Sequence, residues 1–283
     1  MEASSQKRVS SEQWSATARG EGVENLAAYL DAMAAMPLLR EVAERSLALL
    51  DLAPGQSVLE VGCGNGTFLP LLAAAVGPGG RVVGIDHSPQ FVAAAQERVA
   101  AAGVADRVSV READAYRLPF ADATFDAAHC ERVLMHLEDP TAALREMRRV
   151  VQPGGVVVAA ESHWHGIQVD HPDHEAMELL VDRYTTALYH QPRMGLTLNR
   201  RMHEAGLVGR EIVPVVSVIT RYEELTQYGW DPSATAEALV AEGRISRERM
   251  DALFGYLAEA SEKGSMTGAA IAVFIAAGRV PAP

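Results

Sequence analysis

The sequence predicts an α/β protein built on a doubly wound, seven-stranded and mostly parallel sheet with helical lid insertions. Five short apolar segments between residues 57 and 160 alternate with helical segments. Strands of a buried parallel sheet are apolar on both sides, because helices cover both of its faces. Glycine or an acidic residue follows four of these segments closely, at the sheet edge where open α/β folds bind ligands.

The first 50 residues are expected to form an N-terminal arm and capping helices. Residues 1–20 are rich in polar side chains, and we expect a loose arm there. From Val23 to Leu50 the apolar residues recur at near-helical spacing. Pro37 should divide this stretch into two helices, because proline cannot continue the backbone hydrogen bonding of a helix.

Strands and helices alternate over residues 51–162, which we take as the ligand-binding core. The strands expected there are Ser57–Val61, Arg81–Ile85, Val108–Arg111, Phe125–Cys130 and Val156–Ala160. The helices expected between them are Gly66–Val76, Pro89–Ala102 and Thr141–Val150. Pro78-Gly79-Gly80 and Pro153-Gly154-Gly155 should form turns before the second and fifth strands.

The remaining residues, 163–283, are expected to complete the sheet and to carry the lid. Glu211–Thr220 and Met266–Gly278 have the β-branched and small residues of two further strands. Segments 163–192 and 221–264 are predicted to be largely helical insertions that cap the sheet.

Composition excludes several classes of partner. The net charge of −12 argues against binding to nucleic acid or to an anionic membrane, since both require a surface rich in Lys and Arg. The chain has no apolar run long enough to span a membrane and no apolar signal core at its N-terminus, so we expect a cytoplasmic protein.

The two cysteines, Cys63 and Cys130, are expected to be buried thiols. If the protein assembles with itself, we expect a homodimer.

Acidic residues lie at or just beyond the ends of successive predicted strands. Glu60 precedes the glycine loop Gly62-x-Gly64-x-Gly66, and Asp86, Asp114 and Glu131 lie at or beyond the ends of the next three strands. The pyrophosphate of a dinucleotide would be repelled by such a crevice. S-adenosylmethionine carries a sulfonium and an ammonium against one carboxylate, so an acidic site favours it as the cofactor. The glycine spacing also differs from the GxGxxG of dinucleotide folds.

The same segments resemble the motifs of the class I methyltransferases. Val58-Leu-Glu-Val-Gly-Cys-Gly-Asn-Gly66 resembles their first motif, and Gly84-Ile-Asp-His-Ser-Pro89 resembles the second. Segments 112–120 and 125–140 resemble the third and fourth, and segment 149–155 resembles the turn before the fifth strand. The resemblance covers residues 51–162 and is greatest to the small-molecule branch that includes the ubiquinone/menaquinone methyltransferases. It implies a Rossmann-like fold and S-adenosylmethionine as the cofactor.

The resemblance implies a role for the glycine loop and for the end of the second strand. Glu60 and Gly62 would contact the methionine end of the cofactor, and Gly64 would also belong to the cofactor site. Asp86 would accept hydrogen bonds from the ribose hydroxyls, and His87 would lie against the adenine.

Further contacts are implied on either side of these. Asp114 and the backbone of Ala115 would meet the adenine amino group, and the backbone of Glu131 would lie beside the amino group of the methionine moiety. In this family the segment ahead of the first motif folds over the cofactor, and Tyr29 and Trp14 are the candidates for that contact.

Catalytic residues are harder to assign, because methyl transfer is a displacement at a carbon that is already activated. The enzyme chiefly aligns the reactants and excludes water, and a general base is needed only for an acceptor that must lose a proton. His136 and His163, which follow the fourth and fifth strands, are the candidate bases. Trp164 is a candidate wall for an aromatic substrate. His165, His171 and His174 lie nearby in sequence, and we expect them to hold no metal.

Three functions remain open at this point. The first is methyl transfer to O, N or C of a small-molecule metabolite, such as a natural product. The alternative is an enzyme of the same fold and cofactor that catalyses a cyclisation or rearrangement without methyl transfer. The third is a binding domain without activity, which the intact glycine and acidic motifs disfavour. Segment 131–134 lacks the Asn/Asp-Pro-Pro-Tyr sequence of methyltransferases that act on nucleobases or glutamine, which disfavours those substrates.

Overall fold

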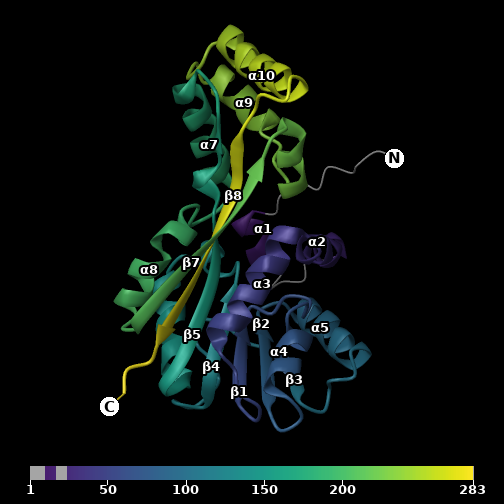
Figure 1. The fold of residues 1–283 in the computed structure, drawn as a ribbon, viewed down its shortest axis with the longest axis vertical. Coiled ribbons are helices and arrows are strands. Elements are labelled where there is room, and N and C mark those ends of the chain that lie inside the picture. Colours follow the sequence, from purple (N-terminus) through teal and green to yellow (C-terminus); the bar gives the residue numbers. More distant parts are fainter. Residues whose placement is uncertain (1–9, 17–23, 283) are drawn as a thin grey trace.

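The computed structural model describes residues 10–16 and 24–282. Its eight strands form one sheet, in which β7 pairs with β8 and the others follow the order β3-β2-β1-β4-β5-β8-β6 (Figure 1). The strands are β1 (Ser57–Val61), β2 (Arg81–Asp86), β3 (Val108–Glu112), β4 (Phe125–Glu131), β5 (Val151–His163), β6 (Gln168–Val169), β7 (Val208–Ile219) and β8 (Gly268–Arg279).

The first five strands are parallel. β1, β2 and β4 are largely buried, as the apolar pattern predicts, whereas the edge strand β3 is partly exposed. β1 pairs with β2 on one side and with β4 on the other, so its carboxyl end lies at the middle of the sheet edge. Val58 and Leu59 of β1 point to opposite faces, and both are fully buried. Only β6, β7 and β8 introduce antiparallel pairs. The mostly parallel α/β fold is therefore confirmed.

Two details of the sheet differ from the prediction. The sheet has eight strands and not seven, because the two-residue β6 pairs with β8 beyond the end of β5. The Pro153-Gly154-Gly155 segment is not a turn before a strand but lies within β5. There it makes an irregularity in the pairing with β4, between Phe125–Val151 and Ala127–Val156. The left-handed φ of Gly154, 82°, lets the strand continue through this bulge.

The helices of the described chain lie between the strands and at one end of the sheet. They are α1 (Ser11–Ala16), α2 (Glu24–Ala34), α3 (Pro37–Leu50), α4 (Leu69–Val76), α5 (Pro89–Ala101), α6 (Pro140–Val150), α7 (His174–Leu188), α8 (Met194–Glu204), α9 (Ser233–Ala241) and α10 (Arg247–Glu262). Short 3₁₀ helices are η2 (Leu134–His136), η3 (Trp164–Gly166) and η4 (Tyr222–Tyr228). The break at Pro37 is where the sequence predicts it.

Local sequence explains where several helices begin. α5 and α6 start with a proline, and the side chains of Ser88 and Asp139 just before them accept hydrogen bonds from the backbone N–H groups of Phe91 and Ala142. These are N-caps, which satisfy backbone donors that have no partner within the helix. The caps fix α5 directly after Asp86 and α6 just after η2, which matters for the site below.

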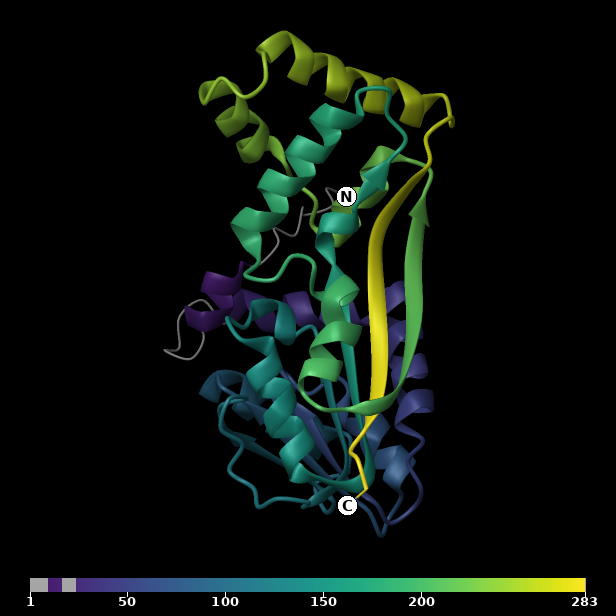
Figure 2. The ribbon, with the colours of Figure 1, turned by 90° about the vertical axis from the view of Figure 1, so that its left-hand side faces the viewer.

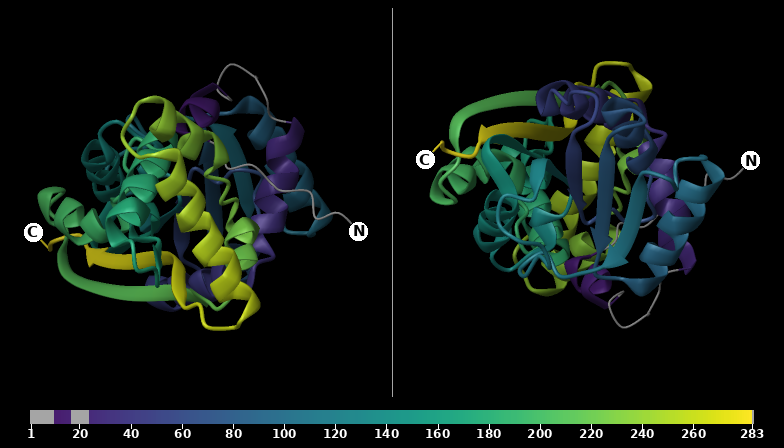
Figure 3. Two further views of the ribbon diagram at one scale, coloured as in Figure 1. Left: turned by 90° about the horizontal axis from the view of Figure 1, so that it is seen from above. Right: turned by 90° about the horizontal axis from the view of Figure 1, so that it is seen from below.

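Helices cover both faces of the sheet. α4 packs on β1 and β2, α5 packs on β2 and β3, and α3 and α8 pack on opposite faces of β5 and β8 (Figure 2). The β7–β8 edge and the C-terminus lie on one side of the molecule, and α5 lies on the other (Figure 3).

The predicted insertions, residues 163–192 and 221–264, lie beyond the parallel strands. They form a second arm, distinct from the predicted N-terminal arm, and "the arm" below refers to this C-terminal one. β5, β7 and β8 extend past the ends of β1 and β4, and α7, α9 and α10 pack on one another around the far end of these long strands (Figures 1 and 2). Across the described ranges, no helix is both long and apolar enough to traverse a lipid bilayer.

Candidate functional site

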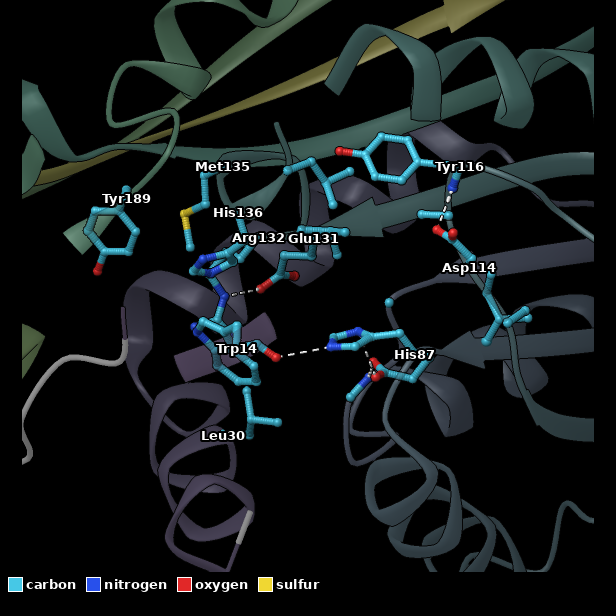
Figure 4. Close-up of a pocket in the computed structure, with 18 of the residues that line it drawn as sticks. Trp14, Leu30, His87, Asp114, Tyr116, Glu131, Arg132, Met135, His136 and Tyr189 are labelled. Atoms are coloured by element: carbon cyan, nitrogen blue, oxygen red, sulfur yellow. Dashed lines mark hydrogen bonds and ion pairs between the residues drawn. The ribbon is translucent and has the colours of Figure 1, made fainter. Parts of the chain in front are cut away.

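A cavity of about 390 Å³ opens at the carboxyl ends of the parallel strands (Figure 4). Its volume lies within the range of small-molecule sites. Its walls come from the glycine loop after β1, the ends of β2 and β4, the segment after β3, the N-terminal helices and the arm. The lining residues are Trp14, Tyr29, Leu30, Gly62, Gly64, Ile85, Asp86, His87, Ala113, Asp114, Ala115, Tyr116, Glu131, Arg132, Val133, Met135, His136, Leu137, Trp164 and Tyr189.

The glycine loop forms one wall as a tight turn that requires glycine. Gly62, Gly64 and Gly66 have φ values of 70°, 52° and 80°, a region that L side chains rarely adopt. A Cβ on Gly62 would lie 2.4 Å from Cγ2 of Val133, and a Cβ on Gly66 would lie 2.9 Å from Cβ of Ala95. The predicted close turn is therefore confirmed, and it leaves backbone rather than side chains at the cavity wall.

Asp86 lies at the end of β2 and organises this loop. Its Oδ2 accepts the backbone N–H of Gly64 at 2.9 Å, and its Oδ1 accepts the backbone N–H of Ser88 at 3.0 Å. The pKa of Asp86 is raised, because the effect of burial exceeds the lowering by His87 and by these N–H groups. Each carboxylate oxygen has about two acceptor positions, so Asp86 can hold the loop and still accept hydrogen bonds from a ligand.

Glu60 is the predicted cofactor residue that does not line the cavity. It lies buried beneath the loop, where its Oε2 is 2.7 Å from Nδ1 of His129. The register of β1 against β4 places these two residues opposite each other. The pKa of Glu60 is raised, because the effect of burial exceeds the lowering by the adjacent His129. We therefore correct the expectation of a direct contact: Glu60 does not line the cavity, and its carboxylate is paired with the buried His129 of β4.

The other predicted acidic residues line the cavity on different strands. Asp114 follows β3 at the exposed rim, and its Oδ1 accepts the backbone N–H of Tyr116 at 2.9 Å. Glu131 ends β4, and its Oε1 is 3.3 Å from Nε of Arg132. Together with Asp86 they bring three carboxylates to one cavity. Ala115 lines the same wall as Asp114.

The N-terminal segment covers the cavity, and part of it is a helix rather than a loose arm. In α1 the ring of Trp14 lies 5.6 Å from Phe91 and 5.6 Å from His136, measured between centroids. The carbonyl of Trp14 lies 3.0 Å from Nε2 of His87. Ser11 Oγ accepts the backbone N–H of His190 at 3.1 Å and lies 3.0 Å from Nδ1 of His136. The remainder of the predicted arm, residues 1–9 and 17–20, lies outside the described residues.

A polar connection that sequence reasoning missed fastens α2 to the glycine loop. The Nδ2 of Asn65 donates to the carbonyl of Ala27 at 3.2 Å and to Oδ1 of Asp31 at 2.9 Å. Arg98 in α5 donates to the carbonyl of Asn65 and to Asp31. This network positions the predicted contact residue Tyr29 on the cavity wall.

The opposite end of the cavity is aromatic and apolar. Trp164 stacks on Tyr189 with centroids 5.2 Å apart and planes 4° from parallel, and its Nε1 lies 3.2 Å from Sδ of Met135. The ring of His136 lies 5.7 Å from that of Tyr189. Trp164 is therefore where the sequence suggested, whereas Tyr189, just after α7, carried no signal in its local sequence.

The two predicted histidines have different positions. His136 lines the cavity, and burial lowers its pKa to about 3, with Arg132, His190 and His87 contributing. His163 lies outside the cavity, because β5 continues past the ends of β1 and β4 and carries it into the arm. It lines a separate groove together with His165. The prediction that His163 lies near the reacting end is wrong. Among the described residues no three His, Cys, Asp or Glu side chains are grouped as a metal site.

Comparisons with known proteins agree with this arrangement. Residues 59–159 match the family model described as a methyltransferase domain. An uncharacterized 37.1 kDa protein in transposon TN4556 of Streptomyces fradiae is 38% identical over 190 residues, which cover 67% of this chain and 54% of that protein. The demethylmenaquinone methyltransferase of Bacillus cytotoxicus is 38% identical over 119 residues, 42% of this chain and 50% of the relative. The chain thus spans about half the length of these curated relatives.

A solved structure shows the same fold. The crystal structure of a candidate methyltransferase from Bacillus halodurans C-125 superposes with a TM-score of 0.61 at 17% identity, covering 86% of this chain and 100% of that one. The family match coincides with the glycine loop, Asp86, Asp114 and Glu131. Residues 59–159 therefore match a methyltransferase domain, and the fold around the cavity is that of the solved structure.

Proposed function

We propose that this protein transfers a methyl group from S-adenosylmethionine to a small molecule bound in the cavity at the carboxyl edge of the sheet. One observation carries the proposal: the cavity has two chemically distinct ends. A glycine cradle with Asp86, Asp114 and Glu131 forms one end, and Met135, Leu137, Trp164 and Tyr189 form the other. Such a division suits a polar cationic cofactor and an apolar acceptor that meet in the middle.

The residues at the polar end fit this cofactor. Asp86 keeps acceptor positions for a pair of ribose hydroxyls after it has bound the N–H groups of Gly64 and Ser88. A Cβ at Gly62 would clash with Val133, so glycine lets the loop pack closely on the segment after β4, and Gly62 and Gly64 present backbone to the cavity. Asp114, Ala115, His87 and Glu131 line the same cavity. In our proposal Asp114 and Ala115 bind the adenine amino group, His87 lies against the adenine face, and the Glu131 backbone binds the methionine amino group.

The chain's own contribution to the reaction is alignment and exclusion of water. S-adenosylmethionine supplies an electrophilic methyl carbon on its sulfonium. Trp14, Tyr29 and Leu30 cover the polar end from the N-terminal helices, and the stacked pair Trp164–Tyr189 bounds the aromatic end. Holding the acceptor nucleophile in line with the methyl carbon in such a closed site lowers the barrier mainly through positioning.

His136 is suited to orient the acceptor rather than to act as a strong base. With a pKa of about 3 its imidazole is neutral at ordinary pH, and Ser11 fixes its Nδ1. A neutral imidazole can hydrogen-bond a hydroxyl or amine of the acceptor. This favours an acceptor that needs little help to lose its proton, such as an acidic phenol or enol, or one that reacts through carbon.

The acceptor that we propose is a flat, largely apolar metabolite, such as an aromatic natural product. Support comes from the row of rings formed by Trp14, His136, Tyr189 and Trp164 along one side of the cavity. The net charge of −12 disfavours polyanionic acceptors such as nucleic acid.

Binding and turnover test the proposal in sequence. Calorimetry with S-adenosylmethionine and S-adenosylhomocysteine should show one site per chain, and Asp86→Ala should abolish it. Incubation with a panel of phenolic and enolic metabolites should yield a product heavier by one methylene, with one equivalent of S-adenosylhomocysteine. An unchanged product mass without S-adenosylhomocysteine, together with turnover of substrate, would support the alternative of cyclisation or rearrangement. Absence of cofactor binding would refute both.

A further inference from the structure

Glu161 is a buried carboxyl group near the site that no part of the mechanism above uses. It lies near the end of β5, has no exposed surface, and does not line the cavity. Its Oε1 accepts the backbone N–H groups of Val133 at 2.9 Å and Leu134 at 2.6 Å, and its Oε2 accepts that of Met135 at 3.3 Å. Three successive N–H groups of one loop thus converge on a single carboxyl group.

The shape of the loop explains why it needs an acceptor at this place. The N–H of Arg132 still donates to the carbonyl of Ala160 at 2.9 Å, which continues the pairing of β4 with β5. Arg132 then takes a left-handed φ of 55° and turns the chain into η2. The first N–H groups of a helix have no partner within it, and buried N–H groups without an acceptor are costly. Glu161 provides that acceptor.

The residues held in this way form two walls of the cavity. Val133 fills the space beside Gly62, where a Cβ would come within 2.4 Å of it, so the loop rests directly on the glycine turn. Met135 and His136 belong to the aromatic end. One buried side chain on β5 therefore sets the position of both the cofactor end and the acceptor end.

We propose that Glu161 is a positioning residue for methyl transfer: it holds residues 133–135 so that Val133 supports the glycine loop and Met135 and His136 bound the acceptor site. This inference rests on the proposed function for its catalytic consequence. The positioning itself is a property of the loop, and cofactor binding reports on it without any acceptor.

The decisive variant is Glu161→Gln, which keeps the size of the side chain and one carbonyl oxygen but loses the second acceptor oxygen. Ser162→Ala is the matched control, because Ser162 is the next residue on β5 and is also buried. We expect Glu161→Gln to raise the hydrogen exchange of segment 131–137 and to weaken binding of S-adenosylhomocysteine about tenfold, as expected when a buried N–H group is left without an acceptor. The control should leave both unchanged. Measurements at a temperature where circular dichroism shows all variants folded separate positioning from unfolding.

A double-mutant cycle identifies the route by which Glu161 acts. If Glu161 acts through Val133, the losses of affinity in Glu161→Gln and Val133→Ala should be strongly non-additive. On an acceptor identified in the panel, Glu161→Gln should lower kcat as well as raise the acceptor KM. Unchanged exchange and affinity in Glu161→Gln, or additive losses in the cycle, would overturn the inference even where the wild type transfers methyl groups. A wild type that binds no S-adenosylhomocysteine would instead refute the proposed function, while the exchange measurement still decides the positioning.

Discussion

The carboxylate of Asp86 and the backbone N–H of Gly64 are joined by a hydrogen bond of 2.9 Å that links the end of β2 to the glycine loop after β1. One residue therefore has two tasks. It fixes a left-handed glycine in place, and it offers its remaining acceptor positions to the cavity. Any change at Asp86 should disturb the loop and the ligand together.

Asp86→Asn tests this dual role. An asparagine has only one oxygen, so its NH₂ must face the N–H of either Gly64 or Ser88, and it also loses the charge that favours a cationic ligand. We expect the affinity for S-adenosylmethionine to fall by about a hundredfold, because a hydrogen bond to a charged group contributes roughly 1.5–3 kcal/mol. Calorimetry measures the loss. Asp106→Asn, at an exposed carboxylate outside the cavity lining, should bind like the wild type. Equal affinities for wild type and Asp86→Asn would show that Asp86 does not face the ligand.

Asn65→Ala should release α2 from the glycine loop. The variant loses the hydrogen bonds to Ala27 and Asp31, while Arg98 can still reach Asp31. We expect faster hydrogen exchange in residues 24–34 and a loss of about tenfold in affinity for S-adenosylmethionine, since Tyr29 and Leu30 are then held less firmly. Asn199→Ala, in α8 away from the cavity, serves as the control. If exchange in α2 stays at the wild-type level, the network does not hold that helix.

The sequence predicted the parallel core because its signals are local. Each strand is a short apolar run, each turn has glycine or proline, and the acidic residues lie near the strand ends, so the topology alone brings Asp86, Asp114 and Glu131 together. The break at Pro37 was predictable for the same reason: a proline acts on its own backbone.

The errors concern features that depend on distant partners. Glu60 has the sequence position of a ligand contact, but the register of β1 against β4 pairs it with His129. His163 follows a predicted strand end, yet β5 runs on past that point because β8 pairs with it as far as His163. Ser11–Ala16 looked like a loose arm, since its packing partners His136 and His190 are more than a hundred residues away. No local pattern marks Glu161 as the hydrogen-bond acceptor for the loop that follows the neighbouring strand β4.

Acidification should destabilise the protein through His136. Its pKa is lowered to about 3 in the folded protein, below the ordinary value near 6.5, so the unfolded chain binds the proton first. The stability that neutral His136 contributes is present above pH 6.5 and is lost as the pH falls toward 3. His136→Gln should remove this dependence, which is about 1.4 kcal/mol for each unit of pH in that window. Urea unfolding of both proteins between pH 7 and pH 4 measures the difference. Parallel curves would mean that His136 titrates normally in the fold.

Gly62→Ala should disrupt the cradle for a reason that a second substitution can partly reverse. The added Cβ would lie 2.4 Å from Cγ2 of Val133, and Gly62 has a φ of 70°. We expect a loss of about 1–3 kcal/mol in unfolding free energy from overpacking and backbone strain, with binding of S-adenosylmethionine abolished. Adding Val133→Ala removes the clash but not the strain, so part of the stability should return. Val133→Ala alone measures the stability lost with its methyl groups. A double variant no more stable than Gly62→Ala, once that loss is added back, would show that strain alone is responsible.

A change in the stacked pair Trp164–Tyr189 should weaken binding of the acceptor and leave the affinity for the cofactor unchanged. The two rings lie 5.2 Å apart at the aromatic end of the cavity, and Asp86 and Gly64 belong to the polar end. Tyr189→Ala removes one wall and its stacking surface, so we expect the acceptor KM to rise about tenfold or more, as loss of an aromatic contact of 0.5–1.5 kcal/mol together with buried apolar area predicts. The affinity for S-adenosylhomocysteine should stay within about twofold of the wild type, the range typical of a substitution that touches no ligand. Tyr189→Phe keeps the ring and should restore the acceptor KM, which separates stacking from any role of the hydroxyl. If Tyr189→Ala weakens S-adenosylhomocysteine as strongly as it raises the acceptor KM, the two ends of the cavity are not separate sites, and the cofactor must extend to the arm.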